Sequence, residues 1–89
     1  MEHQKFTLGK LVATKGAIEA LTAEQIAEAI SRHARGDWGD LCEEDAAENE
    51  LALDMDYLRI FSRYNFNPPV YVITEADRSV TTVLLVSEY

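Results

Sequence analysis

Residues 70–89, VYVITEADRSVTTVLLVSEY, decide the fold class of this 89-residue chain. Two runs of mostly β-branched and apolar residues, 70–74 and 80–86, flank a short polar segment. β-Branched residues favour strands, whereas Asp and Ser favour tight turns. The stretch therefore predicts a β-hairpin that closes on Asp77-Arg78-Ser79.

A further strand is predicted immediately upstream, over residues 57–66. This segment alternates with a period of two, which separates apolar from polar side chains on its two faces. The apolar set is Leu58, Ile60, Tyr64 and Phe66, and the polar set is Arg59, Arg63 and Asn65. Asn67-Pro68-Pro69 then has to turn, because tandem prolines donate no hydrogen bond to a ladder. Together with the hairpin, this strand predicts a three-stranded antiparallel meander.

Two helices are predicted before the meander. Thr22-Ala23-Glu24-Gln25 is a capping box that opens a helix running to about Ala34, and Gly36 is suited to end it. A second helix is predicted from Glu43 to about Asp54. Its inward positions are expected to be Ala46, Ala47 and Leu51, with Cys42 as a further candidate.

The first 21 residues carry weaker signals. Thr14 can cap a short helix over residues 15–21, although Gly16 weakens it. Residues 1–13 fit either an extended arm or a short strand. We therefore expect a single α+β domain, residues 1–89, with two to three N-terminal helices packed on a three-stranded antiparallel C-terminal meander.

Composition excludes several classes of protein. The single cysteine, Cys42, cannot form an intramolecular disulfide, and one cysteine with two separated histidines does not make a structural zinc site. The chain has no metal-binding loop, P-loop or dinucleotide fingerprint, so no metal and no cofactor are predicted. No apolar run approaches the ~20 residues of a membrane-spanning helix, and the N-terminus lacks a signal-peptide pattern. These features predict a soluble cytoplasmic protein that does not associate with membranes.

Acidic residues are concentrated in one window. Between Gly36 and Tyr57 lie nine of the sixteen carboxylates and no lysine or arginine. Such a field repels phosphate backbones, so this face is not expected to bind nucleic acid directly and favours a protein partner with a basic surface. The alternative is a solvated helix face whose first-turn acids are stabilised by the helix dipole.

The leading hypothesis is therefore a small acidic interaction or accessory protein rather than an enzyme. Carboxylates at positions 40, 44 and 48 share one face and could imitate a row of phosphates. The hairpin turn adds a second polar cluster, in which simple turn chemistry does not require an arginine. The candidate binding residues are Asp37, Trp38, Asp40, Glu44, Glu48, Asp77 and Arg78.

One alternative is a metal-independent, ribonuclease-like enzyme. His33 would act as the general base, because its ordinary pKa near 6.5 suits proton transfer. Arg59 and Arg63 would hold a phosphate, with Thr82 as a hydroxyl donor. The structural alternative has His33 partly buried and hydrogen-bonded to Asp37 or a carbonyl, and the arginines paired with the acidic helix. Another alternative is a self-associating structural protein, for example a homodimer, in which the last strand pairs with the same strand of a second copy.

Three segments of the chain support a resemblance. They are VATKGA (12–17), RHARGDWG (32–39) and ITEADRSVTTVLLVSEY (73–89). In this order they resemble the V-A-T-x-G-A, R-H-x-x-G-D-W-G and I-T-E-A-D-R-S-x-T-T-x-L-L-x-x-E-Y patterns of a family of small uncharacterised bacterial proteins common on plasmids and mobile elements. Lys15 and Val86 depart from it, since that family tends to have proline at both positions. The resemblance implies no established activity, but it raises the expectation of a mobile-element-encoded inhibitor.

Overall fold

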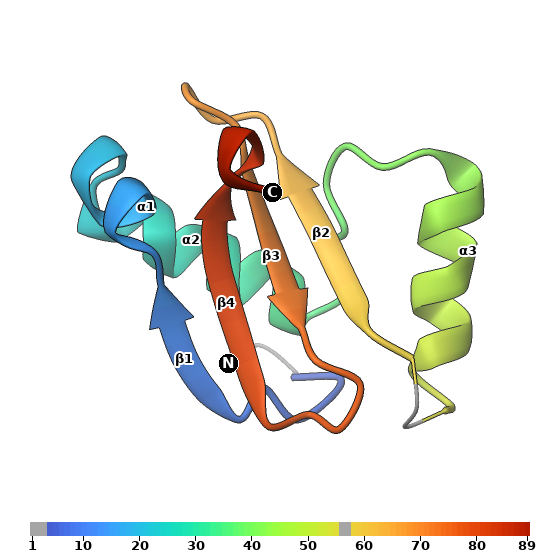
Figure 1. Ribbon diagram of the computed structural model, residues 1–89. Coiled ribbons are helices and arrows are strands. Elements are labelled where there is room, and N and C mark those ends of the chain that lie inside the picture. Colours follow the sequence, from blue (N-terminus) through green and yellow to red (C-terminus); the bar gives the residue numbers. More distant parts are fainter. Residues whose placement is uncertain (1–3, 56–57) are drawn as a thin grey trace.

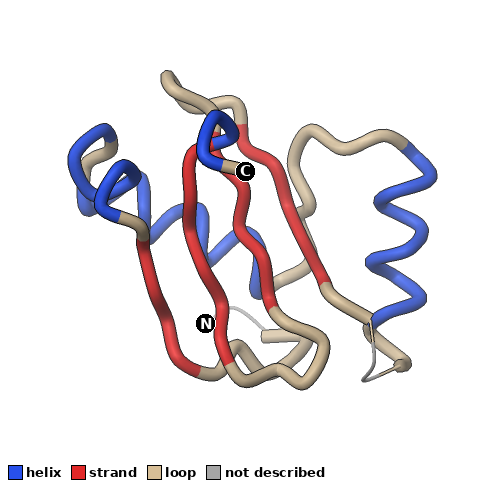
Figure 2. Tube along the Cα trace, viewed as in Figure 1, coloured by secondary structure: helices blue, strands red, loops and turns tan. Residues whose placement is uncertain are grey.

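A computed structural model describes residues 4–55 and 58–89 of the chain. It is an α+β structure in which a four-stranded mixed sheet has helices against one face and a further helix beside one edge (Figures 1 and 2). In chain order the elements are β1 (Lys10–Ala13), α1 (Lys15–Ala20), α2 (Ala23–Ala34), α3 (Glu43–Ala52), β2 (Ile60–Tyr64), β3 (Val70–Thr74), β4 (Val80–Leu85) and a 3-10 turn, η1 (Val86–Glu88).

The predicted hairpin is confirmed, and the predicted sheet was one strand short. Strands β2, β3 and β4 form the antiparallel meander, while β1 pairs in parallel with β4 and gives the order β1-β4-β3-β2. Parallel pairing needs a long crossover, here supplied by the helices and the meander, and therefore leaves no local turn signal. Both sides of β4 are paired inside the chain, so the last strand has no free edge for a second copy.

Helices α1 and α2 cover one face of the sheet. In Figure 1, α2 lies behind the strands and α1 lies beyond the end of β1, while the near face carries neither of these helices. The covered face holds alternate residues of each strand, and the core there is built on Val72, Val83 and Tyr64. We call the two sides the helix face and the outer face.

The predicted helix ends are confirmed for the first two helices. The Thr14 hydroxyl accepts from the Ala17 amide, and the capping box at Thr22 is formed in both directions. Gly36 follows α2 at φ +86°, a conformation that glycine adopts without strain. No helix among residues 4–55 and 58–89 is long and apolar enough to cross a membrane.

The inward face predicted for α3 is correct at Ala46, which packs against the core beside Trp38 and Ile60, and wrong at the other positions. Leu51 is 48% exposed, and Ala47 and Cys42 are also exposed, whereas Asn49 and Ala52 are buried. The reason is that α3 lies beside the edge strand β2 rather than on a face of the sheet (Figure 1). A helix at a sheet edge meets unpaired backbone groups, which an amide satisfies and an apolar side chain does not.

Two segments close this edge of β2. The Asn49 amide donates to the Phe61 carbonyl at 2.6 Å and accepts from the Phe61 amide at 3.2 Å. Further along, the Arg63 amide donates to the Trp38 carbonyl at 3.1 Å, and the Asp40 amide donates to the Arg63 carbonyl at 2.7 Å. Every outward-pointing group at Phe61 and Arg63 therefore has a partner within the chain.

Candidate functional site

His33 lies in the interior between α2 and the sheet. It is fully buried, and its ring bridges two strands: Nδ1 lies 2.6 Å from Ser62 Oγ and Nε2 lies 2.9 Å from Thr74 Oγ1. The expected partners, Asp37 or a backbone carbonyl, are not those found. The Oγ1 atoms of Thr74 and Thr81 lie 2.6 Å apart, and this contact extends the series of hydrogen bonds across the sheet.

The direction of these hydrogen bonds follows from the Leu8 carbonyl at the end of the series, because a carbonyl can only accept. Thr81 donates to the Leu8 carbonyl at 2.7 Å, so its hydroxyl accepts from Thr74. Thr74 must then accept from the Nε2–H of His33, which leaves Nδ1 to accept from Ser62. The network assigns His33 to the neutral tautomer with its proton on Nε2.

Burial lowers the pKa of His33 from 6.5 to about 3, because the charged ring would lose its hydration. The partners described above are hydroxyl groups, which stabilise the neutral ring as well as the charged one. His33 is therefore neutral at physiological pH and linked to β2, β3 and, through Thr81, to β4.

The four residues considered for a ribonuclease-like site do not meet. His33 is on the helix face, whereas Arg63 and Thr82 lie on the outer face of the sheet, since their neighbours Ser62 and Thr81 point to the helix face. Arg59 lines a cavity on the outer face together with Phe61 and Tyr71. The sheet separates the candidate base from the candidate phosphate clamp. This placement removes the shared cleft on which that hypothesis depended.

The two outer-face arginines contact aromatic residues instead of acidic ones. Arg59 Nη2 donates to the Tyr89 hydroxyl at 3.0 Å. The guanidinium of Arg63 lies 6.0 Å from the centre of the Tyr71 ring and donates to Asn65 at 3.3 Å. Within the described residues, neither arginine forms an ion pair with α3.

Asp37 and Trp38 hold the turn between α2 and α3. Asp37 accepts from Arg32 Nε at 2.7 Å, and this guanidinium lowers the pKa of the Asp37 carboxyl while it stacks on the Tyr64 ring at 4.5 Å. Trp38 is 7% exposed, as expected of a packing anchor, and its indole N–H donates to Glu50 at 2.8 Å. Both side chains have internal partners.

Arg78 occupies the hairpin turn at φ +61° and points inward. Its Nη1 donates to the carbonyls of Leu58, Glu75 and Ala76, and its Nη2 donates to those of Ala52 and Met55, at 2.7–3.2 Å. The guanidinium thus satisfies the carbonyl end of α3 and joins it to the turn. Asp77 differs, because it is exposed and its carboxylate accepts from the Ser79 side chain and, at 3.0 Å, from the Ser79 amide.

The acidic candidates remain on the surface. Glu44 and Glu48 are exposed on α3, and Asp40 is exposed just before it, accepting from Asn65 at 2.8 Å. Within the described parts of the chain, the ion pairs are those of Arg32 with Glu28 and Asp37. The carboxylates of α3 thus carry uncompensated charge.

A groove that sequence reasoning did not anticipate runs beside α3 on the outer face. It consists of two adjoining cavities of about 200 Å³ and 390 Å³ that share Arg59 and Phe61. We call it the α3 groove; its lining residues are Asp45, Glu48, Leu51, Leu58, Arg59, Phe61, Tyr71, Ile73 and Tyr89. The spacing of Asp45, Glu48 and Leu51 by three residues was the available signal, since it places them along one side of a helix.

The aromatic side of the α3 groove is ordered by ring contacts. The Phe61 and Tyr71 rings are 6.2 Å apart, and those of Tyr71 and Tyr89 are 5.3 Å apart, both edge to face. Aromatic pairs in this geometry add about 0.5–1.5 kcal/mol to the burial of their surface. The groove therefore combines an acidic helix wall with a fixed apolar floor.

Comparisons with known proteins add no identification. No family model, curated protein or solved structure matches the chain. The resemblance drawn from its motifs therefore stays a prediction. No cluster of three or more metal-ligating side chains is found among residues 4–55 and 58–89.

Proposed function

We propose that the protein is a small interaction module that binds a basic surface of a protein partner through α3. The observation that supports this proposal is the exposure of Glu44 and Glu48 on a helix whose carboxylates have no cationic partner in the described structure. Unpaired surface charge of one sign raises the rate of encounter with a partner of the opposite sign. It contributes most where an apolar contact lies nearby to hold the complex.

The α3 groove supplies such an apolar contact. Leu51 is 48% exposed at its rim, and Phe61 and Tyr71 form its floor. Interfaces draw most of their binding free energy from a few large side chains, with charged residues around them. A partner segment with basic residues opposite Glu48 and an apolar residue over Phe61 would match both features.

The test is a charge reversal on α3. The variant Glu44→Lys with Glu48→Lys should lose a partner that the unchanged chain retains in affinity capture from its native host at low ionic strength. Both side chains are exposed, so the fold should survive, which circular dichroism checks. Raising the salt concentration should release the same partner from the unchanged chain.

A second double variant controls for net charge. Glu19→Lys with Glu24→Lys makes the same change in charge at exposed positions on α1 and α2. It should retain the partner. Full retention by the α3 variant at low salt, or equal loss by both variants, would contradict the proposal.

A further inference from the structure

The two edges of the sheet differ in whether other segments of the described chain cover them. The β2 edge is closed by the Asn49 amide and by the backbone of residues 38–40. At the other edge, β1 pairs only with β4, and no segment of the described chain pairs with its outer side. An open strand edge presents unpaired donors and acceptors that readily pair with another strand.

The register identifies which groups point outward. The backbone amides of Lys10 and Thr14 donate to the carbonyls of Ser79 and Val83, both at 3.0 Å. The amide and carbonyl groups of the even-numbered residues in this segment therefore point towards β4. In a parallel ladder the alternate residues face the other way. The amide and carbonyl groups of Leu11 and Ala13 therefore point to the open edge.

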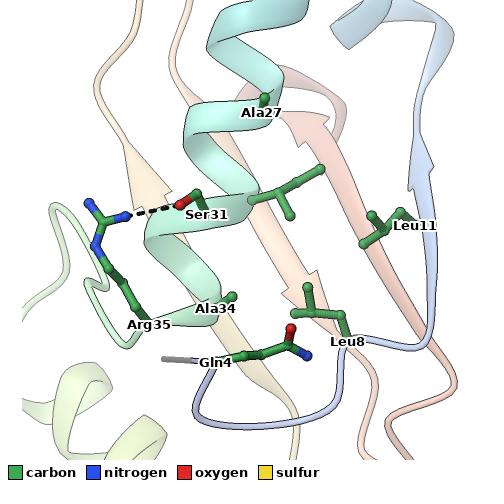
Figure 3. Close-up of a pocket in the computed structure, with 8 residues that line it drawn as sticks. Gln4, Leu8, Leu11, Ala27, Ser31, Ala34 and Arg35 are labelled. Carbon is green, nitrogen blue, oxygen red and sulfur yellow. Dashed lines mark hydrogen bonds between the residues drawn. The ribbon is translucent and has the colours of Figure 1, made fainter. Parts of the chain in front are cut away.

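The side chains at this edge are apolar and exposed. Leu11 is 52% exposed and Val12 is 37% exposed. Leu11 also borders a cavity of about 350 Å³ on the helix face, between α2 and the chain before β1 (Figure 3). Leu8, Ala27 and Ile30 line the same cavity, so the apolar surface continues from the strand edge onto the helix.

We propose that two copies of the chain pair antiparallel through β1 and form one continuous eight-stranded sheet. A two-fold axis at Val12 sets Leu11 of each copy opposite Ala13 of the other. The outward amides and carbonyls of both residues are then exchanged in closely spaced hydrogen-bonded pairs. The backbone of this edge is thus self-complementary in its hydrogen bonding.

Side chains and charges agree with that register. Leu11 and Ala13 share the helix face, so the two cavities meet across the axis and the α2 helices approach each other there. Val12 meets its own copy on the outer face, and Lys10 lies opposite Thr14 rather than another lysine. The carboxylates of α3 lie beyond β2, at the far edge of each sheet, where their mutual repulsion is weakest.

This proposal is independent of the function proposed for α3 and is tested by the oligomeric state. Sedimentation velocity over a range of concentrations should show a dimer for the unchanged chain. Val12→Lys should give a monomer, since two ammonium groups would face each other at the axis. Ile18→Lys, at a more exposed apolar position on α1, should remain dimeric. A monomer at every concentration, or equal loss of the dimer in both variants, would overturn the proposal.

Disulfide formation tests the register itself. Val12→Cys, in a Cys42→Ser background that removes the exposed native thiol, should form a disulfide-linked dimer under mild oxidation. Non-hydrogen-bonded antiparallel pairs have Cα atoms about 4.5 Å apart, within the range that a disulfide spans. Leu11→Cys in the same background should cross-link much more slowly, although Leu11 is the more exposed residue. Equal or faster cross-linking at position 11 would exclude this pairing.

Discussion

Arg78 Nη2, in the turn between β3 and β4, donates a 2.8 Å hydrogen bond to the carbonyl of Ala52, the last residue of α3. The contact joins two parts of the chain 26 residues apart. It explains an arginine that the turn itself does not require, because its guanidinium completes the carbonyl end of a helix. The polar turn is thus a structural joint between the hairpin and the acidic helix.

Replacing Arg78 should therefore destabilise the fold. Arg78→Lys keeps the charge and loses the planar set of donors that reaches five carbonyls. We expect a loss of about 2–3 kcal/mol in the free energy of unfolding, measured by urea denaturation, since hydrogen bonds to charged groups contribute about 1.5–3 kcal/mol. Arg59→Lys, at an exposed position, should cost less than about 0.5 kcal/mol. Similar losses in the two variants would show that the carbonyl contacts do not stabilise the fold.

His33 should make stability depend on pH below neutrality. Its pKa is about 3 in the folded protein and 6.5 when unfolded, so between these values only the unfolded chain takes up the proton. Stability is then lost as pH falls from 6.5 towards 3, by about 1.4 kcal/mol per unit. The variant His33→Gln lacks this titration. The difference in free energy of unfolding between the unchanged protein and this variant, measured by urea denaturation, should therefore narrow by about 2–3 kcal/mol from pH 6.5 to 4.5. A constant gap would mean that the folded ring titrates normally.

The tautomer of His33 is a separate prediction. Thr81 donates to the Leu8 carbonyl, and this fixes the proton of the ring on Nε2. Nitrogen-15 chemical shifts should show a protonated Nε2 and an unprotonated Nδ1 throughout pH 5–8. Thr81→Val removes the hydroxyl that donates to the Leu8 carbonyl, so the ring should no longer prefer the tautomer protonated on Nε2. A protonated Nδ1 in the unchanged protein would reverse the directions assigned to the His33–Ser62, His33–Thr74 and Thr74–Thr81 bonds, and it would contradict the donation from Thr81 to the Leu8 carbonyl.

The parts of the fold that could be predicted are those with local signals. The hairpin has its turn residues between two β-branched runs, and α2 has a capping box at one end and Gly36 at the other. The parallel strand β1 has no such signal, because its partner lies 70 residues away. Partners of buried polar groups are non-local too: His33 meets Ser62 and Thr74 only after the sheet has formed.

The candidate site likewise has parts that follow from local sequence and parts that depend on contacts between distant segments. Exposed carboxylates on α3 were predictable from a charge run within a helical segment. The α3 groove was not, because Phe61, Tyr71 and Tyr89 come from three different segments. A binding role was predicted for Arg78 and Asp37 because charged side chains are usually exposed, whereas the hydrogen-bond partners of both lie within the chain.

Asn49 tests the role of α3 as the cover of the β2 edge. Asn49→Asp keeps the shape and the acceptor but removes the donor to the Phe61 carbonyl, and the new charge would be buried. We expect a loss of about 2–4 kcal/mol at pH 7 and a smaller loss near pH 4, because protonation restores a donor. Repulsion between the new carboxylate and the Phe61 carbonyl should move the side chain away from the strand, so hydrogen exchange of the Phe61 amide should accelerate more than that of Val72, which lies inside the sheet. Glu48→Gln, on the exposed side of α3, should change neither quantity; unchanged exchange at Phe61 in the Asn49 variant would show that the edge is held without it.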